Sequence, residues 1–166
     1  MPGMTPDVAL ARPEDAPVLA ALFELYAYDL SDALALDVGD DGHYPVPPFD
    51  AYFSDPRCHA FLVRVEGRLA GFALVRERSR LTGDERVRDV AEFFVMRRYR
   101  RHGVGEQVAR GLFRRFPGPW EVRQKFANVA ATAFWRRIIG RYAAFSELTV
   151  DDERWRGPVQ CFEARE

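Results

Sequence analysis

The stretch that decides the fold is Val95-Met96-Arg97-Arg98-Tyr99-Arg100-Arg101-His102-Gly103-Val104-Gly105. It follows an apolar run and precedes an amphipathic segment, so that a strand, a glycine turn and a helix come in succession. The first turn of a helix exposes backbone N–H groups at the positive end of the helix dipole. Such a turn binds phosphate groups. The stretch therefore predicts a ligand that carries phosphate as well as a connection between a strand and a helix.

The composition indicates one soluble globular domain over residues 1–166. Hydrophobic residues make up 48% of the chain and charged residues 30%, and the formal net charge is -1. This balance argues against a nucleic-acid-binding protein that depends on a basic field. We expect no membrane segment, because no uninterrupted apolar run is long enough to span a bilayer. The two cysteines, Cys58 and Cys161, are expected to be reduced thiols in a cytoplasmic protein.

Apolar periodicity and turn residues predict the order of elements along the chain. We expect strands at Val8–Ala11, His59–Val65, Leu69–Arg76, Val87–Met96, Trp120–Phe126, Ala143–Val150 and Arg156–Glu163. We expect helices that start near Pro13, at Pro48–Phe53, at about Gly103–Phe116 and after a capping Asn128. Residues 31–48 should form a long acidic loop, and Ser79–Arg86 a second, shorter loop.

The strand, helix, strand, helix order in the centre of the chain predicts an α/β (α+β) fold. A helix that connects two sequential strands favours parallel pairing, whereas the hairpins around it add antiparallel strands. We therefore expect a mixed, mostly antiparallel sheet with a central parallel pair, flanked by helices. Ligands of such sheets bind at the carboxyl ends of the parallel strands, where the arginine and glycine turn is expected to lie.

Two common glycine-rich phosphate loops do not match this turn. A dinucleotide-binding fingerprint requires a third Gly or Ala three positions after the second Gly, and that position is Val108. A Walker A loop requires Gly-Lys followed by Ser or Thr, and the only lysine, Lys125, lies far from the turn.

A third pattern fits. Arg100-x-x-Gly103-x-Gly105 after a strand resembles the acyl-CoA signature Gln/Arg-x-x-Gly-x-Gly/Ala of the GNAT (general N-acetyltransferase) superfamily. Asn128-x-x-Ala131-x-x-Phe134-Trp135 resembles the Asn-x-x-Ala-x-x-aromatic-Tyr element of the same family. The order of strands and helices also matches, so the resemblance covers roughly residues 7–163. It is closest to bacterial acetyltransferases of undefined substrate.

The resemblance implies direct acetyl transfer from acetyl-CoA to an amine of a small molecule or peptide. It assigns binding of acetyl-CoA to Phe94, Val95, Met96, Arg100, Arg101, His102, Gly103, Val104, Gly105, Glu106, Asn128, Ala131, Phe134 and Trp135. Amides from about His102 to Glu106 would hold the pyrophosphate, with charge-assisted contacts from Arg100 and Arg101. The main chain at Phe94–Met96 would pair with the pantetheine arm, and the Val95 N–H would stabilise the developing oxyanion.

Two carboxylates on the central strand are candidates for the general base that an ammonium acceptor needs. Asp89 lies six residues before Val95, where some family members carry a base. Glu92 lies within an apolar strand, where burial would raise its pKa. Strand alternation places the two on opposite faces unless a bulge intervenes. We favour Glu92, and the alternative for it is a structural ion pair with an arginine.

Trp135 is the departure from the family pattern, because many members carry a tyrosine that protonates the leaving thiolate. An indole N–H is not acidic near neutral pH. Three explanations stay open: Tyr142 or another hydroxyl replaces that tyrosine, the thiolate leaves unassisted, or the protein is a poor catalyst.

The resemblance to the family places the acceptor site near the end of the first helix and the acidic loop. Its candidate residues are Tyr26, Tyr28, Asp29 and Tyr44. Acidic and aromatic groups together suit a cationic amine through charge and cation–π contacts. The alternative is a solvated loop held by a few aromatic anchors.

The leading hypothesis is an acetyl-CoA-dependent N-acetyltransferase that acts as a monomer or homodimer, without metal, nucleic acid or membrane. No metal is expected because His43, His102 and the cysteines lack ligand spacing. The first alternative is a non-catalytic acyl-CoA-binding or regulatory module, which the indole at Trp135 suggests. A nucleic-acid-binding domain that uses the arginine cluster is the second alternative.

Overall fold

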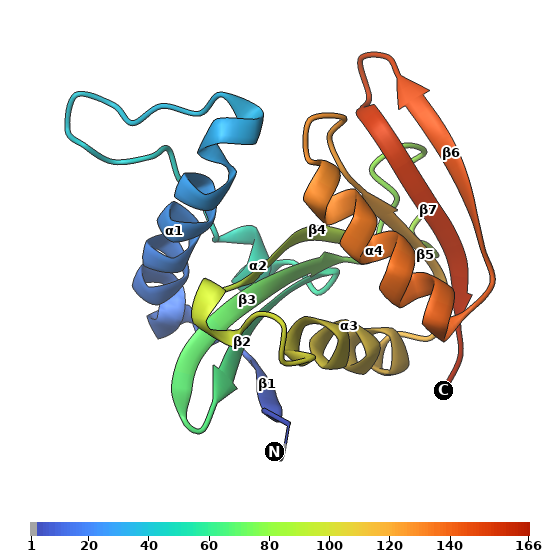
Figure 1. The fold of residues 1–166 in the computed structure, drawn as a ribbon, viewed down its shortest axis with the longest axis horizontal. Helices are drawn as coiled ribbons and strands as arrows, with labels where there is room; N and C mark the ends of the chain where they lie inside the picture. Colours follow the sequence, from blue (N-terminus) through green and yellow to red (C-terminus); the bar gives the residue numbers. More distant parts are fainter. Residues whose placement is uncertain (1–2) are drawn as a thin grey trace. The chain divides into compact units, whose positions relative to one another are not determined.

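The structure is a computed structural model that describes residues 3–166. Seven strands form one sheet in the order β1-β2-β3-β4-β5-β7-β6 (Figure 1). The strands are β1 (Pro6–Leu10), β2 (Cys58–Val65), β3 (Arg68–Arg76), β4 (Arg88–Val95), β5 (Gly118–Arg123), β6 (Phe145–Asp151) and β7 (Arg156–Ala164). The helices are α1 (Ala16–Leu34), α2 (Ala51–Ser54), α3 (Val104–Arg115) and α4 (Val129–Tyr142), with short 3-10 turns η1 (Pro13–Asp15) and η2 (Arg97–Tyr99).

The predicted central parallel pair is confirmed. Strands β4 and β5 run parallel, with Asp89 opposite Glu121 and Val90 opposite Val122. Helix α3 connects these two strands along the chain, as a parallel pair requires. The pairs β1–β2, β5–β7 and β6–β7 are antiparallel, so the sheet is mixed and mostly antiparallel, with helices flanking it.

The chain divides into two compact units. The first contains the described chain up to Leu74 together with Glu92–Val104, and the second contains Val75–Ala91 together with Gly105–Glu166. The boundaries fall inside β3 and β4, so each unit holds part of both strands.

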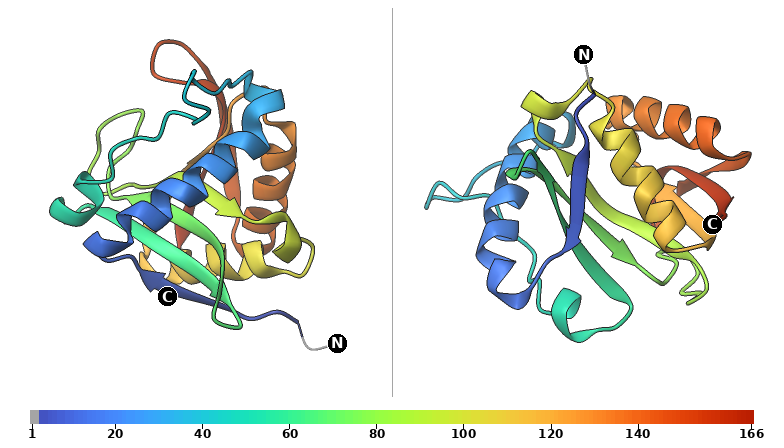
Figure 2. Two further views of the ribbon diagram at one scale, coloured as in Figure 1. Left: turned by 90° about the vertical axis from the view of Figure 1, so that its left-hand side faces the viewer. Right: turned by 90° about the horizontal axis from the view of Figure 1, so that it is seen from below.

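In the first unit, α1 lies beside the strands (Figure 2) and has one apolar face. Leu19 and Leu22 of this face are buried, and the Phe23 ring lies 6.1 Å from the Phe72 ring of β3. Strands β2 and β3 form the expected hairpin. Its turn places Glu66 at φ 52° and Gly67 at φ 74°, the left-handed pair that tight hairpin turns require.

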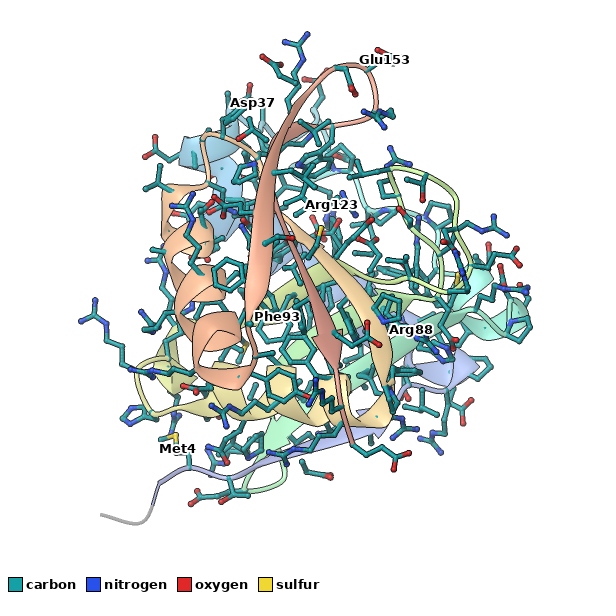
Figure 3. All side chains as sticks on the ribbon, turned by 90° about the vertical axis from the view of Figure 1, so that its right-hand side faces the viewer. Met4, Asp37, Arg88, Phe93, Arg123 and Glu153 are labelled. Carbon is teal, nitrogen blue, oxygen red and sulfur yellow. The ribbon has the colours of Figure 1, made fainter. Side chains whose placement is uncertain are left out.

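In the second unit, the core is an aromatic cluster between the strands and the two long helices. The Phe113 ring of α3 meets the Trp120 ring of β5 edge to face at 5.1 Å, and Trp120 stacks on Phe162 of β7 at 6.4 Å. The β6–β7 hairpin belongs to this unit, and Glu153 lies exposed in its connecting turn (Figure 3).

Several element boundaries differ from the sequence prediction, among them the end of α1 and both ends of β5. Helix α1 continues to Leu34, and its cap Ala35 has φ 52°, so the acidic loop begins several residues later than the predicted 31–48. Alanine and leucine sustain the helix there, because no Gly or Pro occurs between Pro17 and Gly39. Strand β5 begins at Gly118 rather than Trp120 and ends at Arg123 rather than Phe126.

Candidate active site

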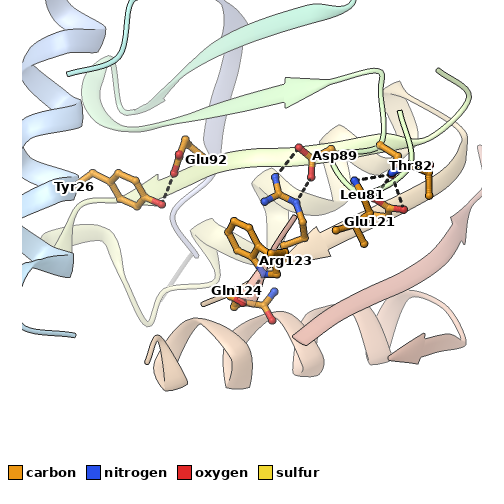
Figure 4. A network of polar contacts seen from close by, with 10 residues as sticks. Tyr26, Leu81, Thr82, Asp89, Glu92, Glu121, Arg123 and Gln124 are labelled. Atoms are coloured by element: carbon orange, nitrogen blue, oxygen red, sulfur yellow. Dashed lines mark hydrogen bonds and ion pairs between the residues drawn. The ribbon is translucent and has the colours of Figure 1, made fainter. Parts of the chain in front are cut away.

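Glu92 and Tyr26 form a polar contact in the first unit. The Tyr26 hydroxyl of α1 donates a hydrogen bond to Glu92 Oε2 of β4 at 2.6 Å (Figure 4). The Tyr26 ring contacts the rings of Phe72 and Phe94 at 5.7 and 5.6 Å. Glu92 is thus a partly exposed carboxylate that a hydroxyl holds at the edge of an aromatic cluster.

Asp89 forms a structural ion pair. Arg123 Nε and Nη2 donate to the two Asp89 carboxylate oxygens at 2.9 and 2.8 Å, and the side chains are only 7% and 2% exposed. The register makes this pair: Asp89 lies opposite Glu121, and Arg123 is two residues further along the same face of β5. Both Asp89 oxygens are therefore committed, which is against its predicted role as the general base (Figure 4).

Arg123 and Glu121 share this face, and the sequence did not single them out. The Arg123 guanidinium also lies 4.3 Å from the centre of the Trp155 ring. The Ser79 hydroxyl donates to the Glu121 carboxylate, with Oγ 3.0 Å from Oε1 and 2.8 Å from Oε2. Burial raises the pKa of Glu121, and the nearby Asp89 charge adds to the effect, although Ser79 opposes it. Period-two alternation along β5 was the available signal, since it places Glu121 and Arg123 on one face.

The turn between β4 and α3 contains two residues with left-handed backbone. Arg101 and Gly103 are both left-handed, with φ of 64° and 76°, and α3 starts at Val104. Left-handed residues just before a helix direct successive backbone N–H groups toward one point. The predicted pyrophosphate site lies in this turn, and the exposed side chains of Arg101 and His102 lie beside it in the chain.

Arg100, which the sequence assigns to the pyrophosphate, contacts groups of the chain itself. Its Nε donates to the Val95 carbonyl at 2.7 Å, and its Nη2 donates to Asp29 Oδ2 at 2.6 Å. Arg97 Nε donates to the same carboxylate at 2.9 Å. Asp29 was predicted to attract a cationic acceptor, but two arginines of the chain already compensate its charge. Burial alone would raise the pKa of Asp29, yet these guanidinium groups overcome that effect and hold it below 3.8.

Helix α4 begins as predicted. The Asn128 side chain caps it by accepting a hydrogen bond from the Ala131 N–H at 3.3 Å. Further along the helix, Trp135 is 5% exposed, and its ring meets that of Phe134 edge to face at 5.2 Å. Trp135 is therefore a packed core residue in the second unit.

Tyr142 lies at the wrong end of α4 to replace the missing acid. Its hydroxyl donates to the Arg165 carbonyl at 2.9 Å. Arg165 follows Ala164, which pairs with Gly118 at the amino end of β5. Helix α4 starts after the carboxyl end of β5 and spans 14 residues, or about 21 Å. The structure therefore argues against Tyr142 as the acid, because the helix carries it away from the carboxyl end of β5.

Glu24 of α1, a third residue that the sequence did not single out, holds the acidic loop. Its carboxylate contacts His43 Nδ1 at 3.0 Å and accepts from the Tyr44 N–H at 2.9 Å. The hydrogen bond with Glu24 raises the pKa of His43 above 6.5. Tyr28 is 66% exposed on the same helix. Tyr44 is thus anchored through its backbone, and Tyr28 is accessible to solvent.

The family is decided by a match to its sequence model. Residues 21–140 match the model of the acetyltransferase (GNAT) family, which is well over half of the 166 residues. The chain belongs to the GNAT family. No curated protein sequence matches it significantly.

Solved structures confirm the GNAT fold. An acetyltransferase from Thermus thermophilus is similar with a TM-score of 0.69 and 16% identity, over 98% of this chain and 99% of that one. Ribosomal-protein-S18-alanine N-acetyltransferase from Escherichia coli is similar with a TM-score of 0.59 and 15% identity, over 97% and 95%. Spermidine N-acetyltransferase from Vibrio cholerae, in complex with CoA and spermine, has a TM-score of 0.64 and 9% identity, over 96% and 95%.

Residues 3–166 contain neither a membrane-spanning helix nor a cluster of metal ligands. No described helix combines the length and the apolar character that crossing a bilayer requires. In the same part of the chain, histidines, cysteines and acidic residues form no group of three or more that could hold a metal ion.

Proposed function

We propose that this GNAT chain is an acetyl-CoA-dependent N-acetyltransferase whose acceptor is an amine of a small molecule or a peptide. The observation that carries the proposal is Glu92, a partly exposed carboxylate held by the Tyr26 hydroxyl at 2.6 Å. The hydroxyl fixes the position of the Glu92 carboxylate, and a carboxylate is a type of side chain that serves as a general base. Asp89, by contrast, is buried and bound through both oxygens to a guanidinium.

The donor site proposed is the turn before α3 together with the main chain of Phe94–Met96. Acetyl-CoA supplies the acetyl group as a thioester. The backbone amides from His102 to Glu106 hold negative charge at the helix start, with Arg101 beside them, and the Val95 N–H donates to the thioester oxygen. The family pattern adds the second motif to the proposed donor site, with Asn128, Ala131, Phe134 and Trp135.

On the acceptor side, Glu92 removes the proton that an alkylammonium must lose before attack, since such amines have a pKa of about 10.4. The amine nitrogen then forms the new bond to the acetyl carbon, the C–S bond of the thioester breaks with its electron pair on sulfur, and the thiolate of CoA leaves. The second proton, which the nitrogen loses as it becomes an amide, passes to water. Because a thiol has a pKa of about 8.5, the thiolate leaves without an acid in this proposal. Tyr26, Tyr28 and Tyr44 line the proposed acceptor region. Asp29 is not included, because Arg97 and Arg100 hold it.

Thermal unfolding tests the donor site. Acetyl-CoA should raise the melting temperature, because a ligand that binds the folded state stabilises it. Gly103→Val should abolish the shift, since a β-branched residue does not adopt φ 76°. Gly111→Ala is the matched control in α3, where an added Cβ meets no atom within 4 Å. A shift that persists in Gly103→Val would place the pyrophosphate elsewhere.

Release of free thiol across a panel of polyamines, amino sugars and peptides tests the activity. Glu92→Gln should lower kcat by about a hundredfold or more, a typical contribution of a general base. Its activity should recover as the pH approaches the pKa of the amine, because deprotonation then occurs in solution. An equal loss in Asp89→Asn, per folded molecule, would contradict the assignment of Glu92.

A non-catalytic acyl-CoA-binding module is the second candidate. The observation that favours it is Trp135, an indole buried in the core at the position where the family pattern has tyrosine. Binding of acetyl-CoA with no thiol release from any amine would support this module. In either case we propose a cytoplasmic protein, monomeric or homodimeric, with its two cysteines as free thiols and without nucleic acid or metal as a partner.

A further inference from the structure

The peptide unit between Val95 and Met96 is held at both ends in the first unit. The Met96 N–H donates to the Ala70 carbonyl of β3 at 2.7 Å. The carbonyl of the same peptide, on Val95, accepts from Arg100 Nε at 2.7 Å. A peptide plane fixed through both its donor and its acceptor cannot rotate, so the backbone at the end of β4 has one orientation.

This orientation decides which edge of β4 the N–H and C=O of Val95 face. In a strand, the N–H and C=O of one residue point to the same edge, whereas those of the next residue point to the opposite edge. Since the Met96 N–H faces β3, both the N–H and the C=O of Val95 face the edge away from β3. Arg100 binds the Val95 carbonyl, and the Val95 N–H lies beside that carbonyl on the same edge. A carbonyl without that cover would repel an electronegative oxygen placed at the Val95 N–H.

Asp29 in turn fixes Arg100. The carboxylate accepts from Arg100 Nη2 at 2.6 Å and Nη1 at 3.4 Å, and its side chain is 20% exposed. The guanidinium also lies 5.8 Å from the centre of the Phe94 ring. Asp29 is three residues after Tyr26, one turn of α1 further on. One helix therefore holds both Glu92 and, through Arg100, the Val95 peptide.

We propose that Asp29 and Arg100 are positioning residues for acetyl transfer: Asp29 orients Arg100, and Arg100 covers the Val95 carbonyl so that the Val95 N–H is presented to the thioester oxygen. The inference rests on the proposed function. It assigns Arg100, the first residue of the acyl-CoA signature, to the strand and not to the pyrophosphate. It also makes α1 the element that sets the geometry of both the base and the oxyanion donor.

Kinetic measurements on four variants test this positioning of the Val95 N–H by Asp29 and Arg100, which we call the Asp29–Arg100 relay. Arg100→Gln should lower kcat by about ten- to a hundredfold, the range expected when a reacting group is displaced by about 1 Å. The Kd for CoA, which lacks the acetyl oxygen, should stay within about twofold. Asp29→Asn should lower kcat in the same direction, and Asp29→Glu, which keeps the carboxylate, should restore part of it. Arg97→Gln is the matched control, because Arg97 binds Asp29 but has no described contact with Val95.

A readout without ligand accompanies the kinetics. The carbonyl ¹³C shift of Val95 and the amide shift of Met96 should change in Arg100→Gln and in Asp29→Asn, and stay in place in Arg97→Gln. Arg100→Lys, which keeps the charge but not the fork of donors, gives a second variant should Arg100→Gln fold poorly. Its kcat should also fall while the Kd for CoA is kept.

The outcomes separate the two proposals. A Kd for CoA that rises tenfold or more in Arg100→Gln, with kcat unchanged, would return Arg100 to the pyrophosphate and overturn the relay alone. Equal losses of kcat in Arg97→Gln and Asp29→Asn would show that Asp29 and its two arginines have only a structural role, and would also overturn the relay. A wild-type protein that binds acetyl-CoA but transfers to no amine would overturn the proposed enzyme and the relay with it.

Discussion

The Asp89–Arg123 ion pair predicts a large and specific effect on stability. At a separation of 2.8 Å, the Coulomb attraction is about 6 kcal/mol with an effective dielectric constant of about 20. Desolvation offsets most of it, because both side chains are less than a tenth exposed. Removal of one partner leaves the other as an uncompensated buried charge, which costs about 3 to 5 kcal/mol. The total free energy of unfolding of a domain is only about 5 to 15 kcal/mol.

The measurement is a double-mutant cycle in urea, with free energies of unfolding from linear extrapolation. Asp89→Leu and Arg123→Met should each lose about 3 to 5 kcal/mol, whereas the double variant should lie within about 2 kcal/mol of the wild type, because two apolar side chains replace the pair. The thioether side chain that Arg123→Met introduces can still pack on Trp155, so the stacking surface is partly kept. Additive losses in the double variant would refute the reasoning, since they would show that the two charges do not compensate each other.

Three further predictions concern glycines and titration. In urea unfolding, Gly111→Ala should raise the free energy of unfolding by about 0.5 to 1 kcal/mol, because this exposed helical glycine has open space for a Cβ. Gly71→Ala should lower the free energy of unfolding, because its Cβ would collide with the Phe94 carbonyl. Because the pKa of Glu121 is raised, its charge lowers the free energy of unfolding at neutral pH, and this cost fades as the pH falls toward 4.5. The free energy of unfolding of Glu121→Gln should therefore exceed that of the wild type by more at pH 7 than at pH 4.5. An NMR titration of His43 should give a pKa above 6.5 that Glu24→Gln lowers; its stabilising contact is complete below pH 6.5 and is lost as pH rises through the folded value.

Local features of the fold were predictable because their causes are local. The left-handed Gly67 closes the β2–β3 hairpin, and Asn128 caps α4, as the residue types imply. The strand, glycine turn and helix around Gly103 were also predicted from their own residues. The end of α1 was not, because acidic residues after Leu30 suggested a loop although the helix continues until Leu34.

The candidate site was predictable only in part. The position of Glu92 within an apolar strand marked it, but its partner Tyr26 is 66 residues earlier in the chain. Asp89 was marked by its spacing of six residues from Val95, yet β-sheet register gives it Arg123 as a partner. Tyr142 shows the converse: its hydroxyl suits an acid, but the length of α4 places it at the other end.

The sequence by itself determined the family and the order of elements, because periodicity, turn residues and the spacing of Arg100, Gly103 and Gly105 are properties of neighbouring positions. Only the tertiary structure decided which charges pair. With 24 basic and 25 acidic side chains, the sequence offers many partners for each, and any of them satisfies the same composition. Burial and register select among them: they join Arg123 to Asp89, Arg100 to Asp29, and the Tyr26 hydroxyl to Glu92.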